Sequence, residues 1–308
     1  MEAVSKNRNV ALVLSSGGAR GLAQIGVIDE LQARGYTITS VAGSSMGALV
    51  GGLFAAGKLG DFKEWVLGLD KLEVISLIDF TITTKGFVKG EKVFTRMQKL
   101  NLVPDVNIED LPIPYVALAV DISNNNECVF RSGSLLKAIR ASIAIPSVFT
   151  PASLERSLLV DGGVLNPLPV EFIVRKPTDL LVAVDLNALI PYEKPKLNKS
   201  SEGKDRYNEK VTALIQKWDE LFGHSQPAKP DKNVKRSQKQ RIGYFDLLLR
   251  SVQLMQSKLT QYAMEANPPD VVIPISKDAS TVFEFYKGEE LIEYGRRMCV
   301  KMLDSKGL

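Results

Sequence analysis

The hydrophobic pattern at the start of the chain predicts alternating strands and helices. Residues 10–14 are a continuous apolar run, which is typical of a strand buried on both faces of a parallel sheet. Apolar residues at helical spacing follow until Gly35, and residues 38–42 predict a second, β-branched strand. Small residues over 48–57 predict a second helix. The resulting βαβα unit places a binding crevice at the carboxyl ends of its strands.

The rest of the chain continues this alternation, so we expect one α/β domain with a largely parallel sheet. The predicted strands are residues 115–122, 127–130, 158–160, 180–186 and 271–275, and the predicted helices are 62–69, 92–100, 135–142, 243–266 and 288–302. One apolar stripe on helix 243–266 is interpreted as core: Phe245, Leu248, Leu249, Val252 and Met255.

Composition indicates a globular protein with one basic segment. Of 308 residues, 45% are hydrophobic and 24% are charged, as is ordinary for a protein with a real core. The net charge of +4 comes from residues 191–241, which hold 13 Lys+Arg against 7 Asp+Glu, while the remaining residues hold 26 against 28. Such a segment suits contact with an anionic surface such as phospholipid, or is a solvated insertion. No interleaved aromatic or recognition-helix signature supports nucleic acid as a partner.

Six apolar residues inside the basic segment share one helical face. Two interpretations stay open: a helix packed on this protein or a partner subunit, and an interfacial helix that docks on lipid. The residues are Val211, Leu214, Ile215, Trp218, Leu221 and Phe222.

Two observations bear on the cellular compartment. Residues 1–9 are polar and charged, without an apolar signal region, so nothing indicates export. Cys128 and Cys299 lie far apart and lack metal-ligand spacing. We therefore expect both to be reduced packing residues in a cytosolic protein.

Residues 43–47, Gly-Ser-Ser-Met-Gly, fit the pattern G-x-S-x-G. In that pattern a serine, here Ser45, lies on a tight strand-to-helix turn with its hydroxyl above a sheet. Gly43 and Gly47 leave room for the strained turn, and the helix start directs amide N–H groups at the serine. Two alternatives compete: a membrane span, because residues 38–57 are uncharged, and a turn in which Ser45 only caps the helix.

A glycine-rich loop at residues 15–21 follows the first strand. It nearly matches the dinucleotide motif G-x-G-x-x-G, with Ser16 in place of the first glycine, but no Asp or Glu lies between Gly35 and Gly57 to bind a ribose. The Gly-Lys-Ser/Thr of a phosphate-binding loop is also missing. Consecutive glycine N–H groups that lead into a helix favour an anion nest, able to hold the oxyanion of an attacked ester.

A nucleophilic serine needs a proton acceptor, usually a histidine positioned by a carboxylate. The sole histidine, His224, lies in the polar basic segment and is a poor candidate. Three aspartates at predicted strand ends could contact the serine directly: Asp121, Asp161 and Asp185. Asp121 is most simply a turn former, and nothing special surrounds Asp185. Two glycines follow Asp161 and let its carboxylate approach another loop, although it too has the simpler interpretation of a turn former.

Three motifs together resemble the patatin-like phospholipase family over about residues 9–187. They are the glycine-rich loop at 16–21, the G-x-S-x-G turn at 43–47, called the elbow below, and Asp-Gly-Gly at 161–163. The resemblance implies that Ser45 is the nucleophile and Asp161 its dyad partner. It departs from the family pattern at Ser16, which replaces a glycine. The implied oxyanion hole consists of the amides around Gly17, Gly18 and Ala19, and the motifs are completed by Arg20, Gly21, Gly43, Gly47, Gly162 and Gly163.

The resemblance also implies a three-layer fold, with helices on both faces of a largely parallel sheet. It implies hydrolysis of fatty acyl esters of phospholipids or lysophospholipids through an acyl-serine, without metal or cofactor. We expect a catalytic core at 9–187, a basic insertion at 191–241 and a C-terminal part at 243–308 that completes the same domain. The expected location is cytoplasmic, with peripheral contact at the inner membrane surface through the insertion. A catalytically idle membrane-surface adaptor of the same fold is the alternative, and the sequence leaves the oligomeric state open.

Overall fold

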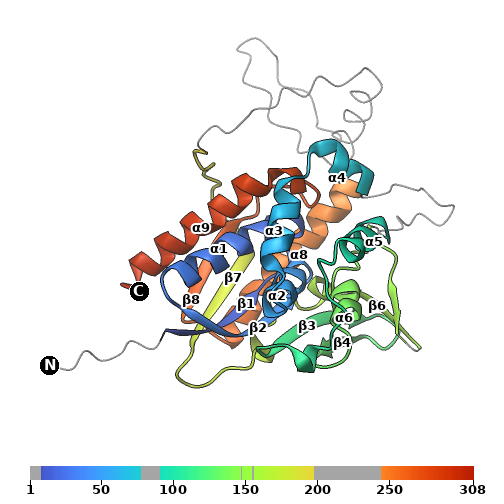
Figure 1. Cartoon of the computed structure of the whole chain (residues 1–308), viewed down its shortest axis with the longest axis horizontal. Helices are drawn as coiled ribbons and strands as arrows, with labels where there is room; N and C mark the ends of the chain where they lie inside the picture. The colour runs from blue at the N-terminus through green and yellow to red at the C-terminus, as the bar shows by residue number, and fades with distance from the viewer. Residues whose placement is uncertain (1–7, 78–90, 147, 155, 198–243) are drawn as a thin grey trace, which may run out of the picture.

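The computed structural model describes residues 8–77, 91–146, 148–154, 156–197 and 244–308 (Figure 1). Their strands form one sheet in the order β5-β6-β3-β2-β1-β7-β8, with β4 paired to β3. The pairings from β3 through β2, β1 and β7 to β8 are parallel, whereas those of β4, β5 and β6 are antiparallel. The strands are β1 (Asn9–Leu14), β2 (Thr37–Ser44), β3 (Tyr115–Asp121), β4 (Asn126–Phe130), β5 (Ala152–Leu154), β6 (Ser157–Asp161), β7 (Leu180–Ala188) and β8 (Val271–Ser276).

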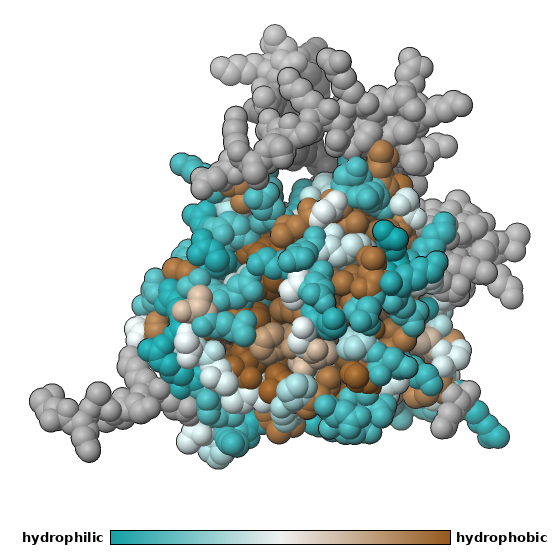
Figure 2. All heavy atoms as spheres, viewed as in Figure 1, coloured by the Kyte–Doolittle hydropathy of each residue, from teal (hydrophilic) through white to brown (hydrophobic). Residues whose placement is uncertain are grey.

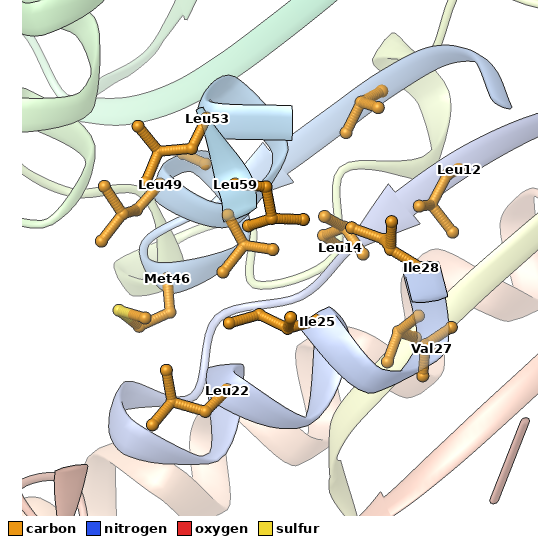
Figure 3. Close-up of a cluster of buried hydrophobic side chains, with 14 of the residues drawn as sticks. Leu12, Leu14, Leu22, Ile25, Val27, Ile28, Met46, Leu49, Leu53 and Leu59 are labelled. Carbon is orange, nitrogen blue, oxygen red and sulfur yellow. The ribbon is translucent and has the colours of Figure 1, made fainter. Parts of the chain in front are cut away.

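Helices cover both faces of the sheet, as predicted (Figure 1). The central strand β1 shows why: its alternate side chains enter two different hydrophobic clusters. Leu12 and Leu14 face α1 and α2 (Figure 3), while Ala11 and Val13 share a cluster with Met264 of α8. The helices are α1 (Leu22–Ala33), α2 (Met46–Ala55), α3 (Leu59–Leu67), α4 (Lys71–Leu77), α5 (Glu91–Lys99), α6 (Leu135–Ser142), α8 (Tyr244–Ala266) and α9 (Gly288–Ser305).

Two glycines bring α1 and α9 into backbone contact. A Cβ on Gly26 would lie 1.9 Å from the carbonyl oxygen of Ile292, and one on Gly295 would lie 1.9 Å from that of Ala23. Neither position accepts a side chain, because real Cβ atoms do not approach a carbonyl that closely. The C-terminal helix therefore belongs to the layer that supports α1.

The stripe on α8 that was interpreted as core is partly wrong. Leu248 is 36% exposed and Met255 57% exposed. The physical reason is that polar residues occupy part of the inward face of α8, where Thr260 is buried and Gln256 donates a hydrogen bond to Gly163. Of the remaining members, Val252 is half-buried, and the side chains of Phe245 and Leu249 lie outside the described residues.

The structure bears on the predictions about a membrane span, the two cysteines and the basic segment. Residues 38–57 fold as β2 and α2, and no helix of the described residues is long and apolar enough to cross a membrane. On the face shown in Figure 2, hydrophobic atoms gather toward the middle and hydrophilic residues dominate the outline. Cys128 and Cys299 are free thiols. Most of the basic segment, including His224 and the predicted helix at 211–222, lies outside the described residues, and the division into core, insertion and C-terminal part stays a prediction.

Candidate active site

Ser45 lies on the tight turn between β2 and α2. Its backbone has φ 55° and ψ −123°, a region that non-glycine residues rarely adopt, and its N–H donates to Ser142 Oγ at 2.9 Å. The flanking glycines make room for this turn: a Cβ on Gly43 would lie 2.3 Å from Gly47 backbone atoms, and one on Gly47 would lie 2.1 Å from the carbonyl oxygen of Leu14. The elbow is thus pressed directly onto β1, and the serine side chain is fixed in place.

The structure places the Asp161 carboxylate against this serine. Ser45 Oγ donates to Asp161 Oδ2 at 2.5 Å, and Gly163 N donates to Oδ1 at 2.7 Å. Both Ser45 and Asp161 are only 3% exposed. Gly162 allows this approach, since a Cβ there would lie 2.3 Å from the carbonyl oxygen of Leu118. Each carboxylate oxygen of Asp161 therefore has its own hydrogen-bond donor, Ser45 for Oδ2 and Gly163 for Oδ1.

Burial changes the acidity of this carboxyl group. Desolvation raises the pKa of Asp161 from 3.8 to about 7, although the hydrogen bonds from Ser45 and Gly163 act in the opposite direction. A carboxylate with a pKa near neutrality is a much stronger base than an ordinary aspartate. The site thus holds a hydroxyl and a suitable base in direct contact.

The loop after β1 faces the same serine. Gly18 has φ +55°, and the 3₁₀ helix Gly18–Gly21 leads into α1. Within the described ranges, the amides of Gly17 and Gly18 have no hydrogen-bond partner, while the amide of Ala19 donates to Val282 O at 2.9 Å. Of the three amides that the resemblance implies, that of Ala19 is therefore already paired, and those of Gly17 and Gly18 are not; the oxyanion hole itself stays a prediction.

Arg20 supports this loop from inside the protein. It is 1% exposed; its Nε donates to Gly17 O and its Nη1 to Lys277 O, each at 3.1 Å. Burial lowers the pKa of Arg20 to about 10, against the opposing attraction of Asp185 and Asp278, so the guanidinium remains charged at neutral pH. The loop is thereby tied to the chain beyond β8.

The other two candidate aspartates have structural partners. Asp121 accepts hydrogen bonds from the backbone amides of Ser123 and Asn124, as expected of a turn former. Asp185 accepts from Asn187 N at 2.8 Å, and burial raises its pKa to about 6. In the part of the chain that is described, no group of three or more His, Cys, Asp or Glu could hold a metal ion.

Two cavities meet at Ser45. The first, of about 80 Å³, has an almost entirely apolar lining that includes Phe62, Trp65, Met97 and Phe149. The second, of about 50 Å³, contains the polar groups of the site, and its wall is completed by Gln253 and Gln256 of α8. Both cavities border Gly18, Ser45, Ile145 and Val282.

Sequence reasoning missed most of this lining. The aromatic residues of α3, and those around Val282, carry no motif and read as ordinary core. Gln253 and Gln256 lie on the helix 243–266, for which the sequence analysis interpreted only the apolar stripe. Only contacts between segments far apart in the chain reveal their place at the site.

Comparison with known proteins adds the following relationships. The family model described as patatin-like phospholipase matches residues 12–174. An uncharacterized NTE family protein of Mycobacterium tuberculosis is 33% identical over 336 residues, which cover 98% of this chain and 93% of the relative. Patatin-like phospholipase domain-containing protein 7 of Mus musculus is 31% identical over 58% of this chain and 14% of its own length. A lysophospholipase of Scheffersomyces stipitis is 29% identical over 60% of this chain and 12% of its own length. Among solved structures, VipD from Legionella pneumophila matches with a TM-score of 0.46 and 15% identity, over 97% of this chain and 67% of that chain.

Proposed function

The chain belongs to the patatin-like phospholipase family, and we propose that it is a serine hydrolase of fatty acyl esters in which Ser45 and Asp161 carry the reaction. The observation that carries the proposal is the 2.5 Å hydrogen bond from Ser45 Oγ to Asp161 Oδ2, buried where an apolar and a polar cavity meet. Family membership and the lysophospholipase relative support lipid hydrolase activity. The roles of the two residues are our proposal.

In the first half of the reaction, Ser45 Oγ attacks the ester carbonyl carbon and its proton moves to Asp161 Oδ2. The carbonyl oxygen becomes an oxyanion, which the unpaired amides of Gly17 and Gly18 stabilise by hydrogen bonding. Collapse of the tetrahedral intermediate breaks the bond to the alcohol, and Asp161 returns the proton to the leaving oxygen. The products of this half are the free alcohol and acyl-Ser45.

The second half releases the acid. A water molecule gives a proton to Asp161 and attacks the acyl-Ser45 carbonyl, which regenerates the oxyanion at the same two amides. Collapse then breaks the bond to Ser45 Oγ, and the proton on Asp161 returns to the serine. A base with a pKa of about 7 suits both halves, because it must accept and donate a proton in every cycle.

The two cavities suggest how a substrate lies. The apolar cavity suits the acyl chain, because its wall is almost entirely aromatic and aliphatic. The polar cavity suits the alcohol part. A phospholipid or lysophospholipid has both parts joined at one ester, so we propose these as the substrate class. We also propose that the basic residues of segment 191–241 contact a phospholipid membrane. Most of that segment lies outside the described residues.

A fluorophosphonate probe combined with a lipid assay tests this function. We expect covalent labelling at Ser45 in the full chain, release of fatty acid from lysophosphatidylcholine, and loss of both in Ser45→Ala. Asp161→Asn should lose hydrolysis because the base is gone. Ser305→Ala is the matched control, since Ser305 is an exposed serine at the end of α9.

The result that overturns the proposal is hydrolysis that persists in both Ser45→Ala and Asp161→Asn with the proteins folded. Absence of labelling and of hydrolysis in the folded wild type would instead support the adaptor of the same fold.

A further inference from the structure

Ser16 carries a buried hydroxyl that the proposed reaction leaves unused. The residue is 2% exposed, and its backbone is fully engaged: its N–H donates to Pro167 O at 2.8 Å, and its carbonyl accepts from Asn187 Nδ2 at 3.1 Å. Its Oγ has no partner among the residues that the structure describes. Ser16 also occupies the position where the family pattern has glycine.

The hydroxyl faces the catalytic aspartate's loop. An ideal Cβ on Gly163 would lie 2.6 Å from Ser16 Oγ and 2.7 Å from Gln256 Nε2, so both polar groups lie beside this glycine. Gly163 itself donates its amide to Asp161 Oδ1 and accepts a 3.1 Å hydrogen bond from Gln256 Nε2. Ser16 and Gln256 therefore flank the loop that holds the base.

Ser16 and Gln256 line the polar cavity beside Ser45. Gln253 lies one turn before Gln256 and borders the same cavity. The polar wall of the cavity thus includes one serine from the first glycine loop and two glutamines from α8.

A buried hydroxyl without a partner is unfavourable, and glycine or alanine at position 16 would avoid the penalty. A molecule bound in the cavity that Ser16 lines can satisfy it, because among the described residues no protein group does. The arrangement favours a neutral polar ligand. The nearby cation, Arg20, already donates to the carbonyls of Gly17 and Lys277.

We propose that Ser16, Gln253 and Gln256 form a subsite for the glycerol part of the leaving alcohol, which they bind through its hydroxyl and ester oxygens. This inference rests on the proposed function, since it assigns the alcohol side of the same ester. The subsite recognises a polyol by hydrogen bonding and makes no ion pair with the head group. It sets how strongly the enzyme prefers a glycerolipid over a simple ester of the same acid.

The test compares two substrates with one acyl chain, 1-palmitoyl-lysophosphatidylcholine and p-nitrophenyl palmitate. Both pass through the same acyl-Ser45, so the ratio of their kcat/KM values reports only the alcohol side. In Ser16→Ala and in Gln253→Ala we expect this ratio, lysophospholipid over p-nitrophenyl ester, to fall about three- to tenfold, the effect of one lost neutral hydrogen bond. Gln261→Ala is the matched control on the exposed side of α8 and should leave the ratio unchanged.

Ser16→Ala is expected to keep or raise the melting temperature, because the buried hydroxyl has no partner in the fold. Wild type that hydrolyses neither ester overturns the proposed function and this inference with it. Active wild type with an unchanged ratio in Ser16→Ala and Gln253→Ala overturns the inference alone, and would mean that the hydroxyl binds a structural water.

Discussion

Replacing Asp161 with asparagine should make the protein more stable at alkaline pH while it abolishes hydrolysis. The folded state holds this carboxyl group with a pKa of about 7, whereas the usual value is 3.8, because burial disfavours the charged form. Ionisation of Asp161 is therefore costly in the folded protein and easy in the unfolded chain. Asparagine removes the charge and keeps oxygen and nitrogen atoms where Gly163 and Ser45 need partners.

The magnitude follows from proton linkage. Between about pH 5 and pH 7 the folded wild type binds a proton at Asp161 that the unfolded chain has lost, so its free energy of unfolding falls as the pH rises through this window. Two pH units at about 1.36 kcal/mol each give roughly 3 kcal/mol. Above pH 7 both states are ionised at this residue, and the loss is complete. Asp161→Asn shows no such loss.

Chemical denaturation near pH 5 and near pH 9, followed by circular dichroism, measures this difference. The free energy of unfolding of Asp161→Asn relative to wild type should increase by roughly 3 kcal/mol between the two pH values. Asp185, whose pKa burial raises to about 6, titrates in both proteins and cancels in the comparison. Asp105→Asn, at an exposed aspartate, is the matched control and should follow the wild type. Equal pH dependence of Asp161→Asn and wild type would refute the buried-base argument, and the mechanism with it.

Three further outcomes are expected. The kcat/KM for an acyl ester should rise with pH to a plateau with its midpoint near 7, because Asp161 accepts a proton only when ionised; a midpoint near 4 would contradict this. Gly47→Ala should lower the free energy of unfolding by about 3 kcal/mol, because its Cβ would lie 2.1 Å from Leu14 O. Gly60→Ala, in open space on α3, should raise it by about 0.5–1 kcal/mol, and a cost equal to that of Gly47→Ala would show that the clash is not the cause. Leu69→Trp should shift the preference from palmitoyl to butyryl esters by filling the apolar cavity, and an unchanged chain-length profile would argue against an acyl site there.

Sequence patterns predicted the parts of this fold whose cause is local. The continuous apolar run of β1 and the turn glycines around Ser45 each follow from a few neighbouring residues. The three-residue strand β5 and the seven-residue helix α4 were not predicted, because elements this short show too little periodicity to distinguish them from loop.

The long-range features of the site were less accessible to sequence reasoning. The amide of Ala19 is satisfied by Val282, which comes from a loop more than two hundred residues later in the chain. Gln256 has no motif around it, and only its hydrogen bond to Gly163 O shows that it lies beside Asp161. Such contacts depend on how whole elements pack, so the spacing of residues along the chain does not reveal them.

The order of the strands in the sheet has a consequence for how the protein is made. β1 leaves the ribosome before the other described strands, yet one of its two neighbours, β7, begins at Leu180. At 5–20 residues per second, β1 waits roughly 8–30 s for that neighbour, with an open edge and an apolar surface. The turn around Ser45 packs against β1 and is therefore not fully supported until β7 has been synthesised. We therefore expect newly made chains to depend on protection from aggregation during translation.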